Sequence, residues 1–237
     1  MRSNSSALLA ATLILACGPG TDARTASNRT GAAVDTPHPP ASSPRDERGV
    51  ILFLGTSLTA GYGVGEDRAF PALIQQKIDS VGLPFRVVNA GISGETSAGG
   101  RARLDWMLQQ PIDVLVLELG ANDGLRGYDV ATMRDNLDAI LRGTRATYPD
   151  AAIVITGMEA PPNLGDRYTT RFRETFRSLA DDYDTALVPF LLDGVAADPA
   201  LNLDDGIHPN PRGHEIVAGT VWDVLEPVLA QRMADTG

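Results

Sequence analysis

Short apolar runs alternate with amphipathic stretches from residue 49 to the end of the chain. The run GVILFLG at 49–55 is continuously apolar over the length of a strand, which is typical of a strand buried on both faces. FPALIQQKIDSV at 70–81 instead carries apolar residues at helical spacing and precedes Gly82, a residue that favours helix ends. The alternation predicts strands at 49–55, 85–91, 112–120, 151–157 and 185–190. It predicts helices at 70–81, 96–109, 130–147, 166–182 and 211–230.

Strands that alternate with helices indicate a parallel sheet covered on both faces. The predicted fold is a three-layer α/β/α domain around a five-stranded parallel sheet with the flavodoxin-like order 2-1-3-4-5. Ligands of such sheets bind beyond the carboxyl ends of the strands, near the point where strand order reverses. The residues after Leu54 and Leu119 are therefore the first place to look for chemistry. Trp106 and Trp222 fall within helical patterns and are expected in the core.

The first 48 residues lack this alternation. An apolar stretch at 7–16, too short to span a bilayer, follows Arg2 and leads into ILAC at 14–17. ILAC resembles the lipobox of bacterial lipoproteins, in which the cysteine is acylated. We expect a signal peptide at 1–17 with lipidation at Cys17, a disordered tether rich in Pro, Ser, Thr and Ala at 18–48, and one folded domain at 49–237. The protein would then be exported and anchored at the cell envelope; an ordinary cleaved signal is the alternative.

Charge and cysteine content exclude several classes of protein. The net charge is -10 and Lys77 is the only lysine, so the basic stripe that a nucleic-acid-binding protein needs is absent. Cys17 is the only cysteine, which excludes an internal disulfide framework and zinc sites built on several thiolates. Lys77 follows glutamine rather than glycine, which excludes a P-loop. No cofactor is expected, and no metal shared by His208 and His214, because histidines six residues apart do not share a helix face.

Four polar segments each follow a predicted strand. They are TSL at 56–58, NAGISGETSAGG at 89–100, GAND at 120–123 and DDGIHPNPRGH at 204–214. Because the carboxyl ends of parallel strands meet at one edge of a sheet, these segments should converge there.

Ser57 and His208 suit nucleophilic catalysis. A serine hydroxyl is a poor nucleophile until a base takes its proton, and His208 lies in a loop at the expected edge. Asp205, three residues earlier, is placed to orient the imidazole, although spacing alone leaves Asp204 as a rival. His38 falls in the tether, and His214 is expected on the face of the last helix.

Attack on a carbonyl also produces an oxyanion that needs donors already in place. The backbone N–H groups of Ser57 and Gly94 and the side-chain amide of Asn122 are the candidates.

Taken together, GTSL with Ser57, ISGETS with Gly94, GAND with Asn122, and DGIH with Asp205 and His208 resemble the blocks of the SGNH (GDSL-type) hydrolase superfamily. The resemblance extends over GTSLTAGYG, VVNAGISGETS, LELGANDGLRG and DDGIHPN, which look like the bacterial thioesterase, lysophospholipase and arylesterase branch. It implies Ser57 as nucleophile, His208 as base, Asp205 as its orienting acid, and Ser57, Gly94 and Asn122 as oxyanion donors. One position departs from the family, because Thr56 stands where aspartate is usual.

The implied function is a cofactor-free serine esterase that hydrolyses carboxylic esters or acyl thioesters through an acyl-enzyme. Its partner would be a small acyl-ester or lipid substrate, the membrane would be met only through the lipid anchor, and the protein would be a monomer. In the resembling enzymes the loop after the fourth strand borders the acyl pocket, which makes Met158, Pro161, Leu164 and Tyr168 candidate lining residues; an exposed loop is the alternative. A carbohydrate O-acetyl esterase and a non-catalytic tethered binding module are the alternative functions.

Overall fold

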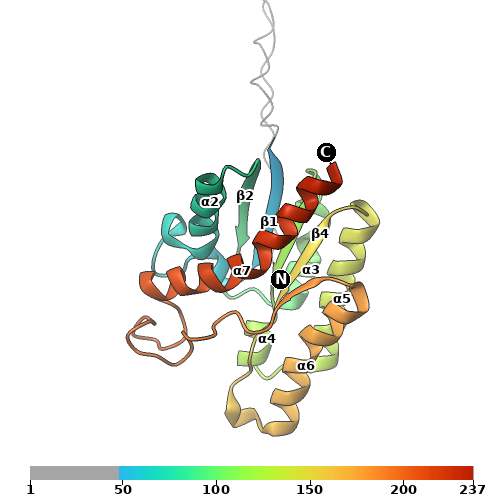
Figure 1. The fold of residues 1–237 in the computed structure, drawn as a ribbon. Helices are drawn as coiled ribbons and strands as arrows, with labels where there is room; N and C mark the ends of the chain where they lie inside the picture. Colours follow the sequence, from blue (N-terminus) through green and yellow to red (C-terminus); the bar gives the residue numbers. More distant parts are fainter. Residues whose placement is uncertain (1–47, 237) are drawn as a thin grey trace, which may run out of the picture. The chain divides into compact units, whose positions relative to one another are not determined.

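The structure, a computed structural model, describes residues 48–236 and contains a parallel sheet with helices on both faces (Figure 1). Its strands are β1 (Gly49–Gly55), β2 (Phe85–Gly91), β3 (Val114–Glu118), β4 (Ala152–Thr156) and β5 (Ala186–Val188). The strand order is β2-β1-β3-β4-β5, and every neighbouring pair is parallel. The predicted fold and strand order are confirmed.

Cys17, the predicted signal peptide and all but the last residue of the predicted tether lie outside the described residues. Among residues 48–236, no helix combines the length and apolar character that crossing a membrane requires.

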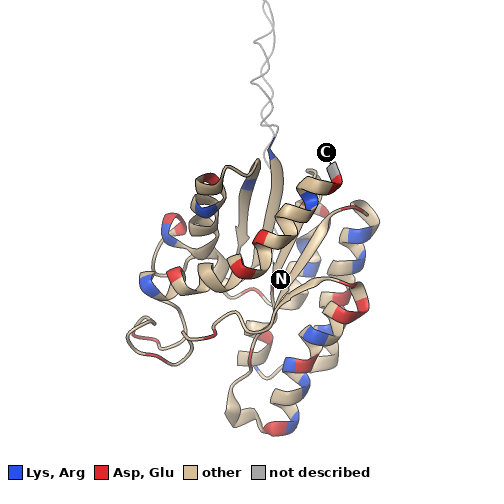
Figure 2. Cartoon of the chain, viewed as in Figure 1, with Lys and Arg blue, Asp and Glu red and all other residues tan. Residues whose placement is uncertain are grey.

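The helices divide between the two faces of the sheet. Helices α2 (Phe70–Val81) and α7 (Pro211–Thr236) pack together on one face, where α7 also contacts β4 and β5. Helices α3 (Ser97–Met107), α5 (Val130–Thr147) and α6 (Asp166–Tyr183) cover the other face, α3 against α5 and α5 against α6. Most charged side chains lie on the helices, while the strands are almost uncharged (Figure 2).

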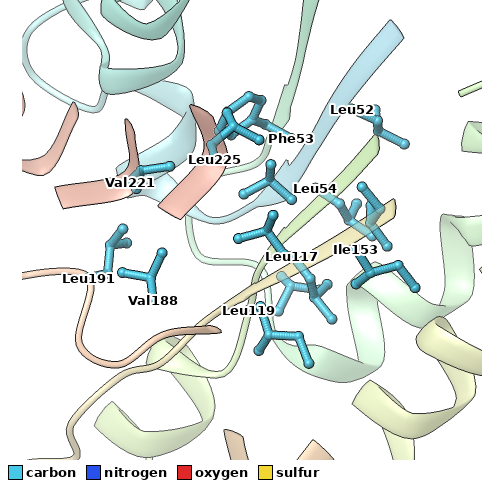
Figure 3. Close-up of a cluster of buried hydrophobic side chains, with 14 of the residues drawn as sticks. Leu52, Phe53, Leu54, Leu117, Leu119, Ile153, Val188, Leu191, Val221 and Leu225 are labelled. Carbon is cyan, nitrogen blue, oxygen red and sulfur yellow. The ribbon is translucent and has the colours of Figure 1, made fainter. Parts of the chain in front are cut away.

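The core lies between the sheet and these two layers. In β1, Ile51, Leu52, Phe53 and Leu54 are at most 2% exposed, as expected for a strand covered on both faces. Leu117 of β3 pairs with Leu54 of this strand, and Leu225 of α7 lies close to Phe53 on one face (Figure 3).

Helix ends follow local sequence signals. Asp129 precedes α5 and accepts the Thr132 N–H at 2.9 Å, while Gly82 ends α2 in the left-handed conformation. The last helix begins at Pro211 and continues to Thr236, six residues beyond the predicted end. It passes through Pro227, an exposed residue that has no N–H to donate to the helix.

Sequence patterns missed two short helices at the carboxyl edge of the sheet. Residues Ser57–Ala60 form α1 and Ala121–Leu125 form α4, where loops were expected. Two single 3-10 turns, η1 (Glu66–Arg68) and η2 (Pro162–Leu164), were missed as well. Elements of this length contain one turn or little more, so hydrophobic periodicity carries no signal for them.

The prediction for the two tryptophans is half correct. Trp222 is 9% exposed and belongs to the core, but Trp106 is 68% exposed on α3. Helical spacing identified the helix but did not decide which of its faces met the sheet.

Candidate active site

Ser57 lies where β1 passes into α1. The Thr56 side chain accepts the Leu58 N–H at 3.3 Å and so caps the helix whose first residue is Ser57. The turn is tight, because a Cβ on Gly55 would meet Thr59 Oγ1 at 2.0 Å. Ser57 is 8% exposed and its hydroxyl faces the His208 ring.

Ser57, His208 and Asp205 form a continuous hydrogen-bonded row. His208 Nε2 lies 2.9 Å from Ser57 Oγ, and His208 Nδ1 lies 2.7 Å from Asp205 Oδ2. With Asp205 ionised, Nδ1 must donate to the carboxylate, which leaves Nε2 free to accept the serine proton. The spacing of these atoms is that of a nucleophile, a base and an orienting acid.

Asp205, and not its rival Asp204, orients the imidazole. The second oxygen of Asp205 accepts the N–H groups of Ile207 and His208, each at 3.0 Å. The hydrogen bond from the Ile207 N–H has the largest effect on the pKa of Asp205, followed by the bond from the His208 ring. Together with the His208 N–H they lower this pKa to about 2. The carboxylate therefore stays charged at neutral pH.

The loop that carries both residues is closed on itself. Asn202 and Pro209 form an antiparallel bridge, and the Leu203 N–H donates to the His208 carbonyl at 2.7 Å. These bonds hold the loop so that the Asp205 carboxylate stays in contact with the His208 ring.

The three candidate oxyanion donors are held differently. Asn122 lies in α4, and its side-chain amide donates one hydrogen to the Glu95 carbonyl at 3.0 Å, which leaves the second hydrogen free. The backbone N–H groups of Ser57 and Gly94 donate to no other group within residues 48–236. Gly94 has φ 80°, and the nearest atom to a Cβ built on it is 3.8 Å away. The positive φ at this position favours glycine, whereas the space around it would accommodate a Cβ.

Glu118 holds the turn that carries Ser57 through hydrogen bonds, and the sequence analysis did not identify this residue. This fully buried carboxylate at the end of β3 accepts the Thr56 N–H at 2.8 Å and the Thr59 hydroxyl at 2.8 Å. It also accepts the Thr56 hydroxyl at 3.0 Å and the Thr59 N–H at 3.3 Å. Burial raises the pKa of Glu118 to about 7, because these four donors replace only part of its lost hydration. An acidic residue inside an otherwise apolar strand was the signal that could have revealed it.

A second buried carboxylate joins the two oxyanion segments. Asp123 accepts the Ser97 hydroxyl at 2.6 Å and the Ser97 N–H at 2.8 Å, and Asn136 donates to the same hydroxyl at 3.2 Å. Because Asp123 is next to Asn122 in the chain, these bonds fix Asn122 relative to the segment that carries Gly94 and Ser97.

A cavity of about 360 Å³ opens beside Ser57, Asn122 and His208. Apolar side chains form most of its wall, from four segments of the chain: Leu58, Leu125, Met158, Ala160, Pro161, Phe190, Leu192, Ala196 and Ile207. Met158 and Pro161 line it as predicted, but Leu164 and Tyr168 do not, so that part of the prediction is wrong. Tyr168 points elsewhere, because its hydroxyl donates to the Tyr128 carbonyl at 2.7 Å and its ring stacks on Phe172.

His214 is not on an exposed helix face. It is 1% exposed, and its Nδ1 accepts the Phe70 N–H at 3.2 Å, so it caps α2 from α7. Burial, and then the charge of His208, lower the pKa of His214 to about 4. Its ring is neutral at physiological pH and serves the fold. Among the described residues, no group of three His, Cys, Asp or Glu side chains is arranged to hold a metal ion.

Comparison with known proteins places this arrangement among hydrolases. Residues 53–216 match the GDSL-like lipase/acylhydrolase family. The chain is 39% identical over 180 residues to esterase TesA of Pseudomonas aeruginosa. The match covers 76% of this chain and 89% of that protein. It is 39% identical over 181 residues to thioesterase 1/protease 1/lysophospholipase L1 of Escherichia coli K12, and the match covers 76% of this chain and 84% of that protein.

A solved structure agrees with these relatives. The psychrotrophic esterase EstA from Pseudoalteromonas sp., in a structure inhibited by monoethylphosphonate, superimposes with a TM-score of 0.72. It is 34% identical, and the match covers 77% of this chain and 99% of that one.

Proposed function

Since this chain belongs to the GDSL-like lipase/acylhydrolase family and is a serine hydrolase, we propose that it hydrolyses carboxylic esters of apolar acyl groups at Ser57. The observation that carries the proposal is the row Ser57 Oγ, His208 Nε2, His208 Nδ1 and Asp205 Oδ2, with contacts of 2.9 and 2.7 Å, at the mouth of an apolar cavity. A tethered module without turnover is set aside, because the family is one of enzymes.

The proposed reaction has two halves. Ser57 Oγ bonds to the carbonyl carbon as its proton passes to His208 Nε2, and the oxyanion receives hydrogen bonds from Ser57 N–H, Gly94 N–H and Asn122 Nδ2. Collapse breaks the bond to the leaving alcohol or thiol, which takes the proton from Nε2. Water then attacks the acyl-enzyme, again with His208 as base, and frees the acid and Ser57.

Asp205 would act throughout as the counter-charge of the imidazolium. Its lowered pKa keeps the carboxylate ionised at neutral pH.

The cavity favours an acyl chain over an acetyl group on a carbohydrate. Its wall is mostly apolar, and the one acidic residue in the wall, Glu159, is already paired with Arg173, whose Nη2 lies 2.8 Å from Glu159 Oε2. A sugar would leave its hydroxyls against side chains that offer few hydrogen bonds. Aryl esters of longer acyl groups, lysophospholipids and acyl thioesters all present such a chain, and we propose them as the substrate class.

The test is Ser57→Ala assayed with p-nitrophenyl butyrate. We expect kcat to fall by ~10⁴-fold or more, because the nucleophile is lost while the oxyanion donors remain. Unchanged thermal unfolding would show that the fold is kept.

A fluorophosphonate probe gives a second readout that does not depend on the choice of ester. The wild-type protein should be labelled at Ser57 and the alanine variant should not, because only an activated serine reacts rapidly. Ester turnover that survives in Ser57→Ala would refute the assignment.

A further inference from the structure

The ring of Tyr62 lies against the ring of His208. Their centroids are 4.5 Å apart and their planes are inclined by 39°. Both imidazole nitrogens are already engaged, one with Ser57 and one with Asp205, so the contact with Tyr62 is made by the ring itself. The Tyr62 hydroxyl forms no hydrogen bond with any other part of residues 48–236, so the aromatic ring is the part of this side chain that contacts the site.

The backbone holds Tyr62 in this position. Its N–H donates to the Ser57 carbonyl at 3.0 Å, one turn after the nucleophile, and Gly61 ends α1 with φ 75°. Gly63 lets the same loop pack on Leu203, since a Cβ there would lie 2.4 Å from Leu203 Cδ1. The segment that carries Tyr62 is thus tied to the nucleophile at one end and pressed against the Asp205–His208 loop at the other.

The geometry points to Tyr62 as a positioning residue for His208, one that holds the imidazole in line with Ser57 and Asp205 and stabilises its protonated form. This inference rests on the proposed function, in which His208 becomes an imidazolium in each half of the reaction. A cation within about 6 Å of an aromatic centroid is attracted by the negative face of the ring. The 4.5 Å separation lies within that limit.

Two effects of the tyrosine ring oppose each other. The π face favours the charged imidazole, whereas the bulk of the ring removes water that would also favour it. The second effect is limited because the His208 side chain keeps 17% of its surface exposed and Tyr62 is itself 51% exposed. A variant that keeps bulk but lacks a π face separates the two effects.

The other titratable groups near the imidazole are few. Asp205 is in contact, Asp204 precedes it in the same loop, and His214 is near enough for the charge of His208 to lower the pKa of His214. None of these changes when Tyr62 is substituted, so a shift in the titration of His208 would come from the ring.

The experiment compares Tyr62→Phe with Tyr62→Leu in p-nitrophenyl butyrate hydrolysis. We expect phenylalanine to stay within about twofold of wild type, because the π face remains. Leucine should lower kcat by about two- to fivefold with little change in KM, and should move the acid midpoint of the kcat profile down by about half a pH unit.

Tyr128→Leu is the matched control. Tyr128 is 50% exposed, like Tyr62 at 51%, but its ring does not stack on His208. We expect its kcat and pH profile to equal those of wild type.

An NMR titration of the histidine ring protons reads the same effect without turnover. The full chain has only three histidines, and His208 is identified by its loss in His208→Gln. In Tyr62→Leu the His208 midpoint should fall below that of Tyr62→Phe. This readout keeps the inference separate from the proposed function, since it does not need an active Ser57.

Three results would overturn the inference. Equal kcat and equal His208 midpoints in the two variants would remove the role of the π face. A phenylalanine variant as impaired as leucine would transfer the effect to the hydroxyl. A change in KM alone would make Tyr62 a wall of the substrate site.

Discussion

Thr56 stands where the resembling family usually has aspartate, and its hydroxyl both accepts and donates a hydrogen bond there. Its hydroxyl oxygen accepts the Leu58 N–H that starts α1, as an aspartate would, and its proton is donated to Glu118. An aspartate here would set two buried carboxylates against each other, and one of them would have to stay protonated. Threonine caps the nucleophile helix without that second charge.

Glu118→Gln tests the anchor beneath Ser57. Glutamine keeps one acceptor oxygen but turns an NH₂ group toward the donors of Thr56 and Thr59, so at least one buried donor loses its partner. We expect the free energy of unfolding to fall by about 1–3 kcal/mol and kcat to decrease, because the nucleophile turn loosens.

The pH dependence of that loss follows from the pKa of Glu118, which burial raises from its ordinary value of 4.5 to about 7. A raised pKa means that the folded state holds the proton more tightly, so this contribution to stability is complete below pH 4.5 and is lost as pH rises through 7. Urea unfolding should show a gap between wild type and variant that narrows from pH 4.5 to pH 8. A constant or widening gap would contradict the burial of a titrating carboxyl.

Asn122→Ala tests the oxyanion donor. The Glu95 carbonyl fixes the amide and leaves one N–H for the reaction, so we expect kcat to fall by about 10²- to 10³-fold with KM little changed. Steady-state kinetics with an aryl ester measures both constants. A loss below tenfold would remove Asn122 from this role.

At the scale of elements, α2 depends on a residue from the far end of the chain. Ala69, at its N-cap position, offers no side-chain acceptor, and His214 of α7 accepts the first N–H instead. The helix was predicted from its apolar spacing alone. The contact that caps it spans 144 positions, and no local pattern could have indicated it.

His214→Ala should lower the free energy of unfolding by about 1–3 kcal/mol at pH 7, because the Phe70 N–H is left buried and unpaired. His214→Asn, which can still accept, should be milder. Urea unfolding of both variants at one pH measures the difference. Equal stability of the alanine variant and wild type would show that the cap contributes nothing.

The asparagine variant also isolates the titration of His214, whose pKa falls to about 4 from 6.5. A depressed pKa means that this stability is present above pH 6.5 and lost as pH falls through 4, where the ring gains a charge and loses its acceptor. Wild type should therefore lose stability relative to His214→Asn over that range. Parallel pH curves for the two proteins would refute this.

At the scale of the whole molecule, the cavity exists only where four segments meet. Leu58 follows β1, Leu125 follows β3, Met158 to Pro161 follow β4, and Phe190 to His208 follow β5. No single segment defines its volume or its apolar character. Substrate preference is therefore a property of the assembled sheet edge.

A series of p-nitrophenyl esters from acetyl to octanoyl should show kcat/KM rising by about fourfold per methylene until the cavity is filled. Ala196→Trp, at an exposed lining position, should reduce octanoyl hydrolysis more than acetyl hydrolysis. Ala200→Trp, also exposed but outside the cavity wall, is the control. A preference for acetyl in the wild-type protein would favour the carbohydrate esterase instead.

The sequence by itself predicted the parallel sheet and the four segments that meet at its carboxyl edge. Buried strands are continuous apolar runs, and parallel topology obliges the segments that follow them to meet. This convergence, together with the resemblance of the four motifs to one hydrolase superfamily, is why Ser57, Asn122 and His208 could be named before any coordinates.

Only the tertiary structure decided the contacts between distant groups. It chose Asp205 over Asp204, because backbone N–H groups fix one carboxylate and not the other. It excluded Leu164 and Tyr168 from the cavity, turned Trp106 to solvent, and placed Glu118, His214 and Tyr62 where they act. The hydrophobic pattern indicates only approximately which face of an element is buried. It carries no information on which polar groups a buried side chain will contact.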